Sequence, residues 1–174
     1  MNVYYAKTAL YAFASLEEIA VQIDELVEKK ALSSMCDFSS ALSQCEKILN
    51  YTTQKDALFA LKIRIEEVLS NFSEDDLDCL DYKYFKKKPK EYYVGFDYES
   101  RAYFRKQARL IEKVAILLEE NGTTDKWFEE NCMCMDFFKE LFKRTVEHEK
   151  SYCKKGLPRP RTMKNVKIER RLSA

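Results

Sequence analysis

Glycine and proline are scarce in this sequence, with three of each among 174 residues. Sheets and turn-rich folds use these two residues at their turns, so their scarcity argues against a β-rich protein. Leucine, alanine, glutamate and lysine are abundant instead, which is the composition of helices. The sequence therefore predicts an all-α fold, and its length allows one compact domain or a small domain with an extended appendage.

The residues that usually assemble a catalytic centre are also sparse. There is one histidine, and neither a glycine-rich phosphate loop nor a nucleophile elbow occurs. Adjacent acids such as Asp75 and Asp76 lie beside a predicted helix start, where capping explains them. A site formed by carboxylates at metal-binding spacing across a helix bundle is the alternative that the sequence leaves open. We expect no enzymatic activity and no cofactor.

Long apolar runs are absent as well. No segment approaches the roughly 20 uncharged apolar residues that cross a bilayer. The N-terminus lacks a basic stretch followed by an apolar run and a cleavage site. We therefore expect a cytoplasmic protein with no membrane partner.

Six cysteines could suggest a disulfide scaffold, but they are scattered through helical patterns in a chain too large to need one. Cys132 and Cys134 form a C-x-C pair, and the lone His148 follows fourteen residues later. No CxxC or HxxxH pair accompanies them, so we expect reduced thiols and no metal. Whether this pair has a role stays open. The six are Cys36, Cys45, Cys79, Cys132, Cys134 and Cys153.

The net charge of +1 conceals a strong asymmetry along the chain. Residues 1–82 hold 7 basic and 15 acidic groups, and residues 114–150 hold 5 and 9. Residues 83–113 hold 10 basic and 4 acidic groups, and residues 151–174 hold 8 and 1. Such gathering of positive charge is expected where a protein meets a polyanion, although a solvated charged face is the other interpretation.

Residues 1–70 are predicted to form a coiled-coil-like helical hairpin. Apolar residues at alternating steps of three and four predict a seam between Tyr5 and Leu26, and a second helix is expected over 41–69. A connection of about ten residues lets the second helix fold back on the first, while a parallel homodimer through the first helix is the alternative. The seam comprises Tyr5, Ala9, Ala12, Leu16, Ile19, Ile23 and Leu26, and the second stripe Tyr51, Leu58, Leu61, Ile65 and Val68.

Residues 71–122 are predicted to form a small helix-turn-helix domain. N-cap residues, a proline suited to a first helical position and glycines at the turn and helix end set its boundaries. In order they are an N-cap at Ser73, a short helix over Pro89–Val94, a turn at Gly95, an N-cap at Ser100, a long helix over Arg101–Glu120 and a helix end at Asn121 and Gly122.

Residues 123–153 are predicted to be a C-terminal helical segment. Thr124 or Asp125 opens a short helix, and an amphipathic helix then runs to about Tyr152. Residues 154–174 form a basic tail with no apolar period, which we expect to be disordered when free. That tail is either a solubilising segment or a non-specific grip on phosphates.

The long helix from Arg101 carries the most informative pattern. One face is predicted to pack inward, and basic residues follow another face about 120° away. Lys106 and Tyr103 flank the basic face. The inward residues are Phe104, Ala108, Ile111, Ala115 and Leu118, and the basic ones Arg101, Arg105, Arg109 and Lys113.

A helix with arginines at three successive turns, preceded by a short helix and a turn, matches the needs of a recognition helix in the major groove of double-stranded DNA. Arginine reads guanine through two parallel hydrogen bonds, whereas lysine serves phosphate as a point charge. We expect Arg101, Ala102 and Arg105 to meet base edges. The full predicted interface comprises Ser100, Arg101, Ala102, Arg105, Lys106, Arg109 and Lys113, with Lys86, Lys87, Lys88 and Lys90 on phosphates.

The segment from Ser73 to about Glu119 resembles region 4 of bacterial sigma factors and the related helix-turn-helix of phage-type late transcription regulators. The resemblance lies in an acidic capped helix ending in Tyr82-Lys-Tyr-Phe85, and in Ser100 followed by a basic helix that becomes apolar toward Leu118. It covers about 47 of the 174 residues. It implies sequence-specific transcription regulation, with recognition of a promoter element and RNA polymerase as a possible partner.

Two departures from that family pattern are evident. Tyr92-Tyr93-Val94 replaces the usual Ile-Ala pair, and the customary glycine lies at Gly95. Nothing before Asn71 resembles the sigma region that melts promoter DNA, so the resemblance implies a regulator with a sigma-like reader. The alternative is a non-enzymatic helical adaptor that binds a protein, and the many aromatic residues also admit single-stranded nucleic acid or RNA.

Overall fold

The computed structural model describes residues 1–33, 41–86 and 101–154, and these residues are helical, with no strand among them. The predicted all-α class is confirmed for this part of the chain. None of its helices is both long and apolar enough to cross a membrane. The elements are α1 (Val3–Phe13), α2 (Leu16–Ser33), α3 (Ala41–Leu69), α4 (Glu74–Leu80), the π-helical turn η1 (Asp81–Phe85), α5 (Arg101–Glu120), α6 (Asp125–Asn131) and α7 (Asp136–Lys154).

The prediction of a single helix between Tyr5 and Leu26 is wrong, because the helix is interrupted at Ala14 and Ser15. The Ser15 amide donates to the carbonyl of Ala12 at 2.8 Å, which tightens the end of α1, and the Ser15 carbonyl accepts from Ile19 as α2 begins. Neither glycine nor proline marks the break. The reason is tertiary: α1 is apolar around most of its surface and enters the core, whereas α2 is apolar on one side only.

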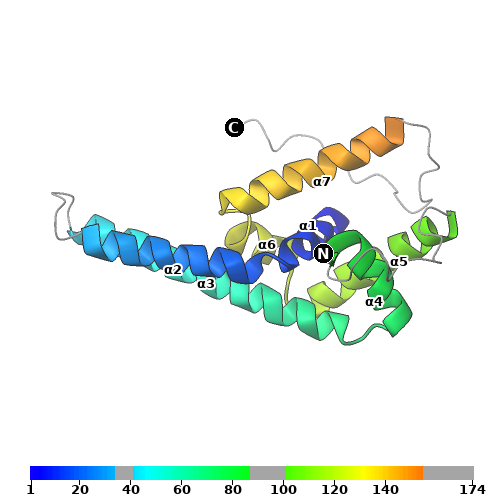
Figure 1. Cartoon of the computed structure of the whole chain (residues 1–174), viewed down its shortest axis with the longest axis horizontal. Helices are drawn as coiled ribbons and strands as arrows, with labels where there is room; N and C mark the ends of the chain where they lie inside the picture. Colours follow the sequence, from blue (N-terminus) through cyan, green and yellow to red (C-terminus); the bar gives the residue numbers. More distant parts are fainter. Residues whose placement is uncertain (34–40, 87–100, 155–174) are drawn as a thin grey trace.

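Helices α2 and α3 run antiparallel and project together from the rest of the molecule as an arm (Figure 1). Lys55 of α3 pairs with Asp24 of α2 at 2.7 Å, and Lys62 pairs with Glu17, so the two chain directions are opposed. Apolar residues lie between the helices. Those buried there include Leu16, Ala20 and Ile23 of α2 and Leu58, Leu61 and Ile65 of α3.

Helix α1 lies at the centre of the fold, where it contacts α3, α5, α7 and η1. Its Tyr5 ring packs on Phe128 and Phe142, with centroids 5.1 and 5.2 Å away. The Tyr5 hydroxyl donates to Glu129 at 2.8 Å, and burial together with this acid raises the pKa of Tyr5. One continuous hydrophobic cluster therefore joins residues from α1 to α7.

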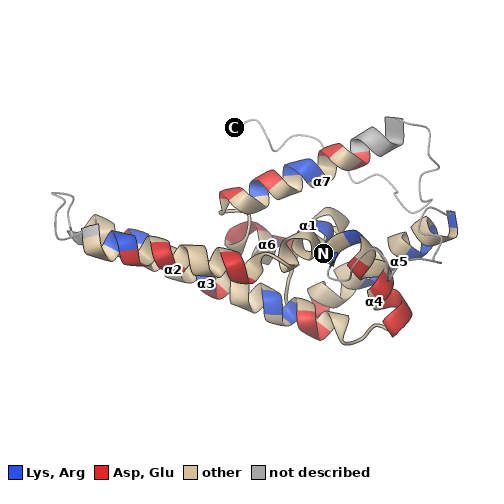
Figure 2. Ribbon diagram, in the orientation of Figure 1, with Lys and Arg blue, Asp and Glu red and all other residues tan. Residues whose placement is uncertain are grey.

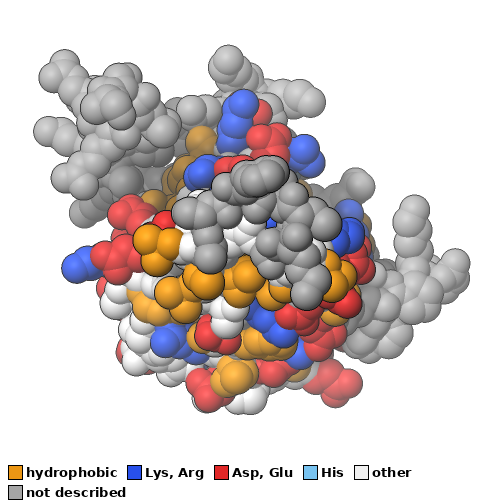
Figure 3. All heavy atoms as spheres, turned by 90° about the vertical axis from the view of Figure 1, so that its left-hand side faces the viewer, with side chains coloured by type: hydrophobic (Ala, Val, Ile, Leu, Met, Phe, Trp, Pro, Cys, Tyr) orange, Lys and Arg blue, Asp and Glu red, His pale blue; other side chains and the backbone are white. Residues whose placement is uncertain are grey.

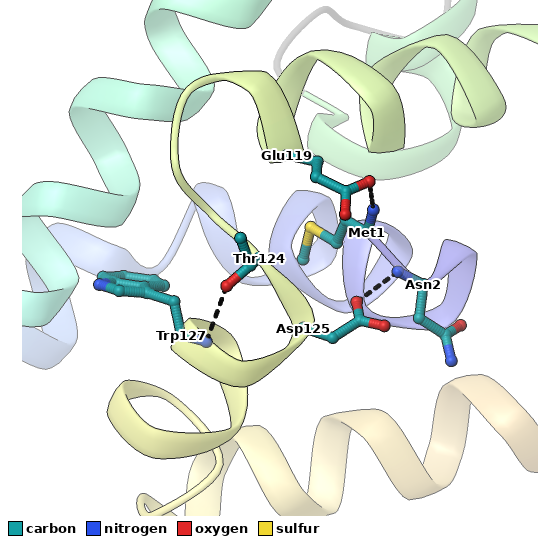
Figure 4. A network of polar contacts seen from close by, with 6 residues as sticks. All are labelled: Met1, Asn2, Glu119, Thr124, Asp125 and Trp127. Carbon is teal, nitrogen blue, oxygen red and sulfur yellow. Dashed lines mark hydrogen bonds and ion pairs between the residues drawn. The ribbon is translucent and has the colours of Figure 1, made fainter.

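The start of α1 is joined by polar contacts to the end of α5 and to the start of α6 (Figure 4). The Asn2 amide donates to the Asp125 carboxylate, and the Met1 amino group pairs with Glu119. Of the two residues predicted to open α6, Thr124 is its N-cap, and its hydroxyl oxygen accepts from the amide of Trp127 at 3.2 Å. Gly122 has a φ of 84°, which confirms its expected place at the end of α5.

Replacing Thr124 with alanine should lower the free energy of unfolding by about 1 kcal/mol, because the Trp127 amide loses its acceptor at the helix start. Thr124→Ser keeps the oxygen and should retain most of the stability. Urea unfolding followed by circular dichroism measures both variants. Equal losses for alanine and serine would assign the effect to the threonine methyl group instead of the cap.

Candidate nucleic-acid interface

Helix α5 is anchored to α1, α3 and α4 by one face, and its arginines lie on the opposite side. At 100° per residue, Arg101, Arg105 and Arg109 lie about 110°, 150° and 170° from the centre of the buried face. The burial of this face fixes the direction in which the arginines point. Its buried residues are Gln107, Leu110, Ile111, Val114, Ala115 and Leu118.

Arg101, Arg105 and Arg109 are all exposed. Successive members are four residues apart, so the three Cα atoms span about 12 Å along the helix. This length is comparable to the roughly 12 Å width of the major groove of B-DNA. We name these three residues the arginine stripe. Glu112, which is half-buried, is the acid that follows the stripe one turn later.

Two predicted DNA-binding lysines of α5 instead contact the start of α4 within the protein. Lys106 pairs with Asp76 at 2.9 Å and donates to the carbonyl of Asp75 at 3.1 Å. Lys113 donates to the carbonyl of Asn71 at 3.4 Å, and its ammonium lies 4.3 Å from the centre of the Phe72 ring. These lysines therefore hold α5 against the segment that contains residues 71–76.

The Lys106 contact also sets the ionisation of its partner. Its hydrogen bond is the main reason that the pKa of the Asp76 carboxyl is lowered, and a hydrogen bond from Ser73 acts in the same direction. Ser73 is the N-cap residue of α4, as predicted, although its side chain does not cap a backbone amide. The ion pair between Lys106 and Asp76 thus links the middle of α5 to the start of α4.

The predicted helix ending in Tyr84 and Phe85 stops being α-helical at Leu80 and continues as the π-helical turn η1. Lys86 closes that turn with a φ of 50°, and its amide donates to the carbonyl of Asp81 at 2.7 Å. The Lys86 side chain is exposed. Several predicted features lie outside the described residues: the helix over Pro89–Val94, the turn at Gly95, and the contacts assigned to Lys87, Lys88, Lys90 and Ser100.

Aromatic rings lie beside the arginine stripe. The prediction that Phe104 packs inward is wrong, because 40% of its surface is exposed. It stands against Tyr103 with centroids 5.6 Å apart, and Tyr103 in turn meets Tyr82 edge-on at 6.0 Å. Phe104 lies at the outer edge of the apolar face near the start of the helix, a position from which periodicity alone does not distinguish packing from exposure.

Charge around α5 is strongly divided (Figure 2). Glu74, Asp75 and Asp76 occupy the first turn of α4, where they complement the helix dipole. Lys106 faces these acids, whereas the arginine stripe lies on the far side of α5 from the buried face. A polyanion would therefore meet α5 through the stripe, since an approach over the start of α4 brings it toward carboxylates.

Sequence reasoning did not single out Lys83 of η1. Burial lowers the pKa of Lys83, and the neighbouring Lys7 lowers it further, while Glu149 opposes both. Glu149 forms an ion pair with Lys7, which connects α1 to α7. A lysine inside a tyrosine-rich segment gives no sequence signal of its burial, because burial depends on how distant segments pack.

Metal binding gains no support in the described part of the chain. Within it, no group of three or more His, Cys, Asp or Glu residues is arranged to hold an ion. Cys132 is buried, which raises the pKa of its thiol to about 12, and Cys134 is exposed.

Comparison of the chain with protein-family models, with curated proteins and with solved structures found no match.

Asp76→Asn should lower the free energy of unfolding at neutral pH by less than about 1 kcal/mol, because this ion pair is partly exposed. The folded pKa of Asp76 is lowered, so its contribution is present above the unfolded-state pKa and is lost as pH falls through the folded one. The difference between wild type and variant should therefore vanish in acid. Urea unfolding of the wild type and the variant, at neutral pH and in acid, tests this. Glu74→Gln on the same helical turn is the control.

Proposed function

We propose that the chain is a sequence-specific DNA-binding transcriptional regulator that uses α5 as its recognition helix. The proposal rests on the arginine stripe, which places three exposed guanidinium groups on successive turns of α5. They are directed away from the face that anchors the helix. Helices that read the major groove present such residues from a rigid support. The resemblance to sigma region 4 supports the same use of this helix.

The contacts that hold α5 in place favour a DNA-reading helix over a charged face that is only solvated. Lys106 and Lys113 join α5 to the residues before and within α4, so the stripe is held in a fixed orientation. A helix that is already held in place binds a duplex at a smaller entropic cost than a segment that must first be ordered. Arg101 and Arg105, nearest the helix N-terminus, are assigned to base edges, and Arg109 to the phosphate backbone.

The exposed rings of Tyr82 and Phe104 favour a second candidate, which is single-stranded nucleic acid or RNA stacked on aromatic side chains. Both rings lie near the arginine stripe on the same part of the molecule, since Tyr103 links them. Duplex DNA is preferred because the guanidinium groups, and not the rings, occupy the face opposite the anchor. Contacts to RNA polymerase belong to the proposal through the family resemblance alone.

Arg105→Ala should weaken binding to a selected duplex by about 1 to 3 kcal/mol if Arg105 reads a base. Fluorescence anisotropy with duplex DNA, single-stranded DNA and RNA at several salt concentrations measures this for the full chain, after a selection among random duplexes. Arg105→Lys separates the two roles of the side chain. It should restore much of a phosphate contact but little of a bidentate base contact.

Lys126→Ala is the matched control, because Lys126 is an exposed cation on α6 and forms only a 3.7 Å pair with Glu130. It should leave affinity nearly unchanged. Equal losses for Arg105→Ala and Lys126→Ala would show non-specific attraction, and absence of duplex binding at low salt would refute the proposal. Preference for single strands, abolished by Phe104→Ala, would select the second candidate.

A further inference from the structure

Helix α3 exposes a second apolar stripe on the side away from the core. Its members follow alternating steps of three and four residues, and we name them the outer stripe. Among its large hydrophobic residues, Leu42 is 72% exposed, Leu49 68%, Ile63 55% and Phe59 43%. The full stripe is Leu42, Cys45, Leu49, Thr52, Asp56, Phe59, Ile63 and Glu66, and each of its members is exposed.

The regularity of the outer stripe sets it apart from ordinary surface apolar residues. Single exposed leucines are normal, but here five apolar residues occupy positions of one heptad seam, with Thr52, Asp56 and Glu66 at the other three. Apolar residues in this spacing are the pattern of a helix-packing surface. The opposite side of α3 already packs on α2 and the core through Leu58, Leu61 and Ile65. Figure 3 views the molecule from the side toward which the arm points, and hydrophobic side chains lie among charged ones on that side.

The outer stripe is symmetric about Gln54 in the kinds of residue it contains. Reversing α3 about this point places Leu49 against Phe59, Cys45 against Ile63, and Thr52 against Asp56. Cys45, Leu49, Phe59 and Ile63 each thus meet an apolar residue. Thr52, whose hydroxyl donates to the Ile48 carbonyl at 3.0 Å in its own helix, lies opposite the Asp56 carboxylate. Only Leu42 against Glu66, at the ends, departs from the pattern. A two-fold dimer requires such self-complementarity of a single surface.

We propose that the outer stripe is the docking surface for a second copy of this chain, with the two α3 helices antiparallel about Gln54. A parallel arrangement would place Asp56 against its own copy in an apolar seam, which is unfavourable, whereas the antiparallel one separates these charges. Lys55 lies beside the axis, but it is paired with Asp24 at 2.7 Å within its own chain. That pair reduces repulsion between the two Lys55 residues.

This inference does not rest on DNA binding, because it concerns α3 and not α5. It also differs from a seam through the first helix, since the buried side of α2 is already occupied by α3. If both proposals hold, the dimer presents two arginine stripes related by a two-fold axis.

Sedimentation equilibrium of the full chain over a wide concentration range is the first test. The wild type should be a dimer, and Leu49→Glu should weaken it by more than about a hundredfold, because each dimer contains the changed position twice. Val21→Glu is the matched control, as Val21 is 58% exposed on α2 and lies off the stripe. It should leave the dimer intact. A monomeric wild type, or a dimer equally affected by both changes, overturns the proposal.

Cysteine cross-linking tests the direction of pairing. Ile63→Cys should form an interchain disulfide with native Cys45 under mild oxidation, identified by peptide mapping, because the antiparallel register brings these positions together. Lys47→Cys, on another face of α3, should not form that disulfide. A Cys45–Cys45 link in the wild type would show the parallel arrangement and refute the antiparallel register.

Discussion

Burial of α1 is the constraint on which the rest of the structure depends. This helix of eleven residues contacts α3, α5, α7 and η1, and its Ala6, Ala9, Leu10 and Ala12 are fully buried. Small alanine side chains allow neighbouring helices to approach closely, which brings segments far apart in sequence into one core. The break after Phe13 follows from this role, because a straight continuation would carry α2 away from its place beside α3.

This central helix determines which faces remain outside. Helix α5 must turn its apolar side toward α1, so the arginine stripe points away from the core. Helix α3 packs on α2 and the core with one side, so the outer stripe remains uncovered. The two proposed surfaces are therefore consequences of the same packing. They differ in chemistry, since one is suited to a polyanion and the other to an apolar helix.

Local patterns predicted much of the fold. The bounds of α3 and α5, the cap at Thr124 and the helix end at Gly122 agree with the structure, because each depends on residues adjacent in sequence. The break at Ala14, the π-helical turn and the exposure of Phe104 were not predicted, since they depend on packing between distant segments. The contacts of Lys106 and Lys113 within the protein were not predicted either, because charge counts do not reveal which cations contact other parts of the chain.

That last distinction bears on the charge of α5. Counted by sequence, residues 101–113 carry five cations, yet Lys106 is paired with Asp76 and Lys113 contacts Asn71 and Phe72. The remaining three cations are arginines, and all lie on one side of the helix. Under the proposed function, the lysines hold the helix and the outward-facing arginines bind, because orientation must be set before binding and the outward groups must be able to form directed hydrogen bonds.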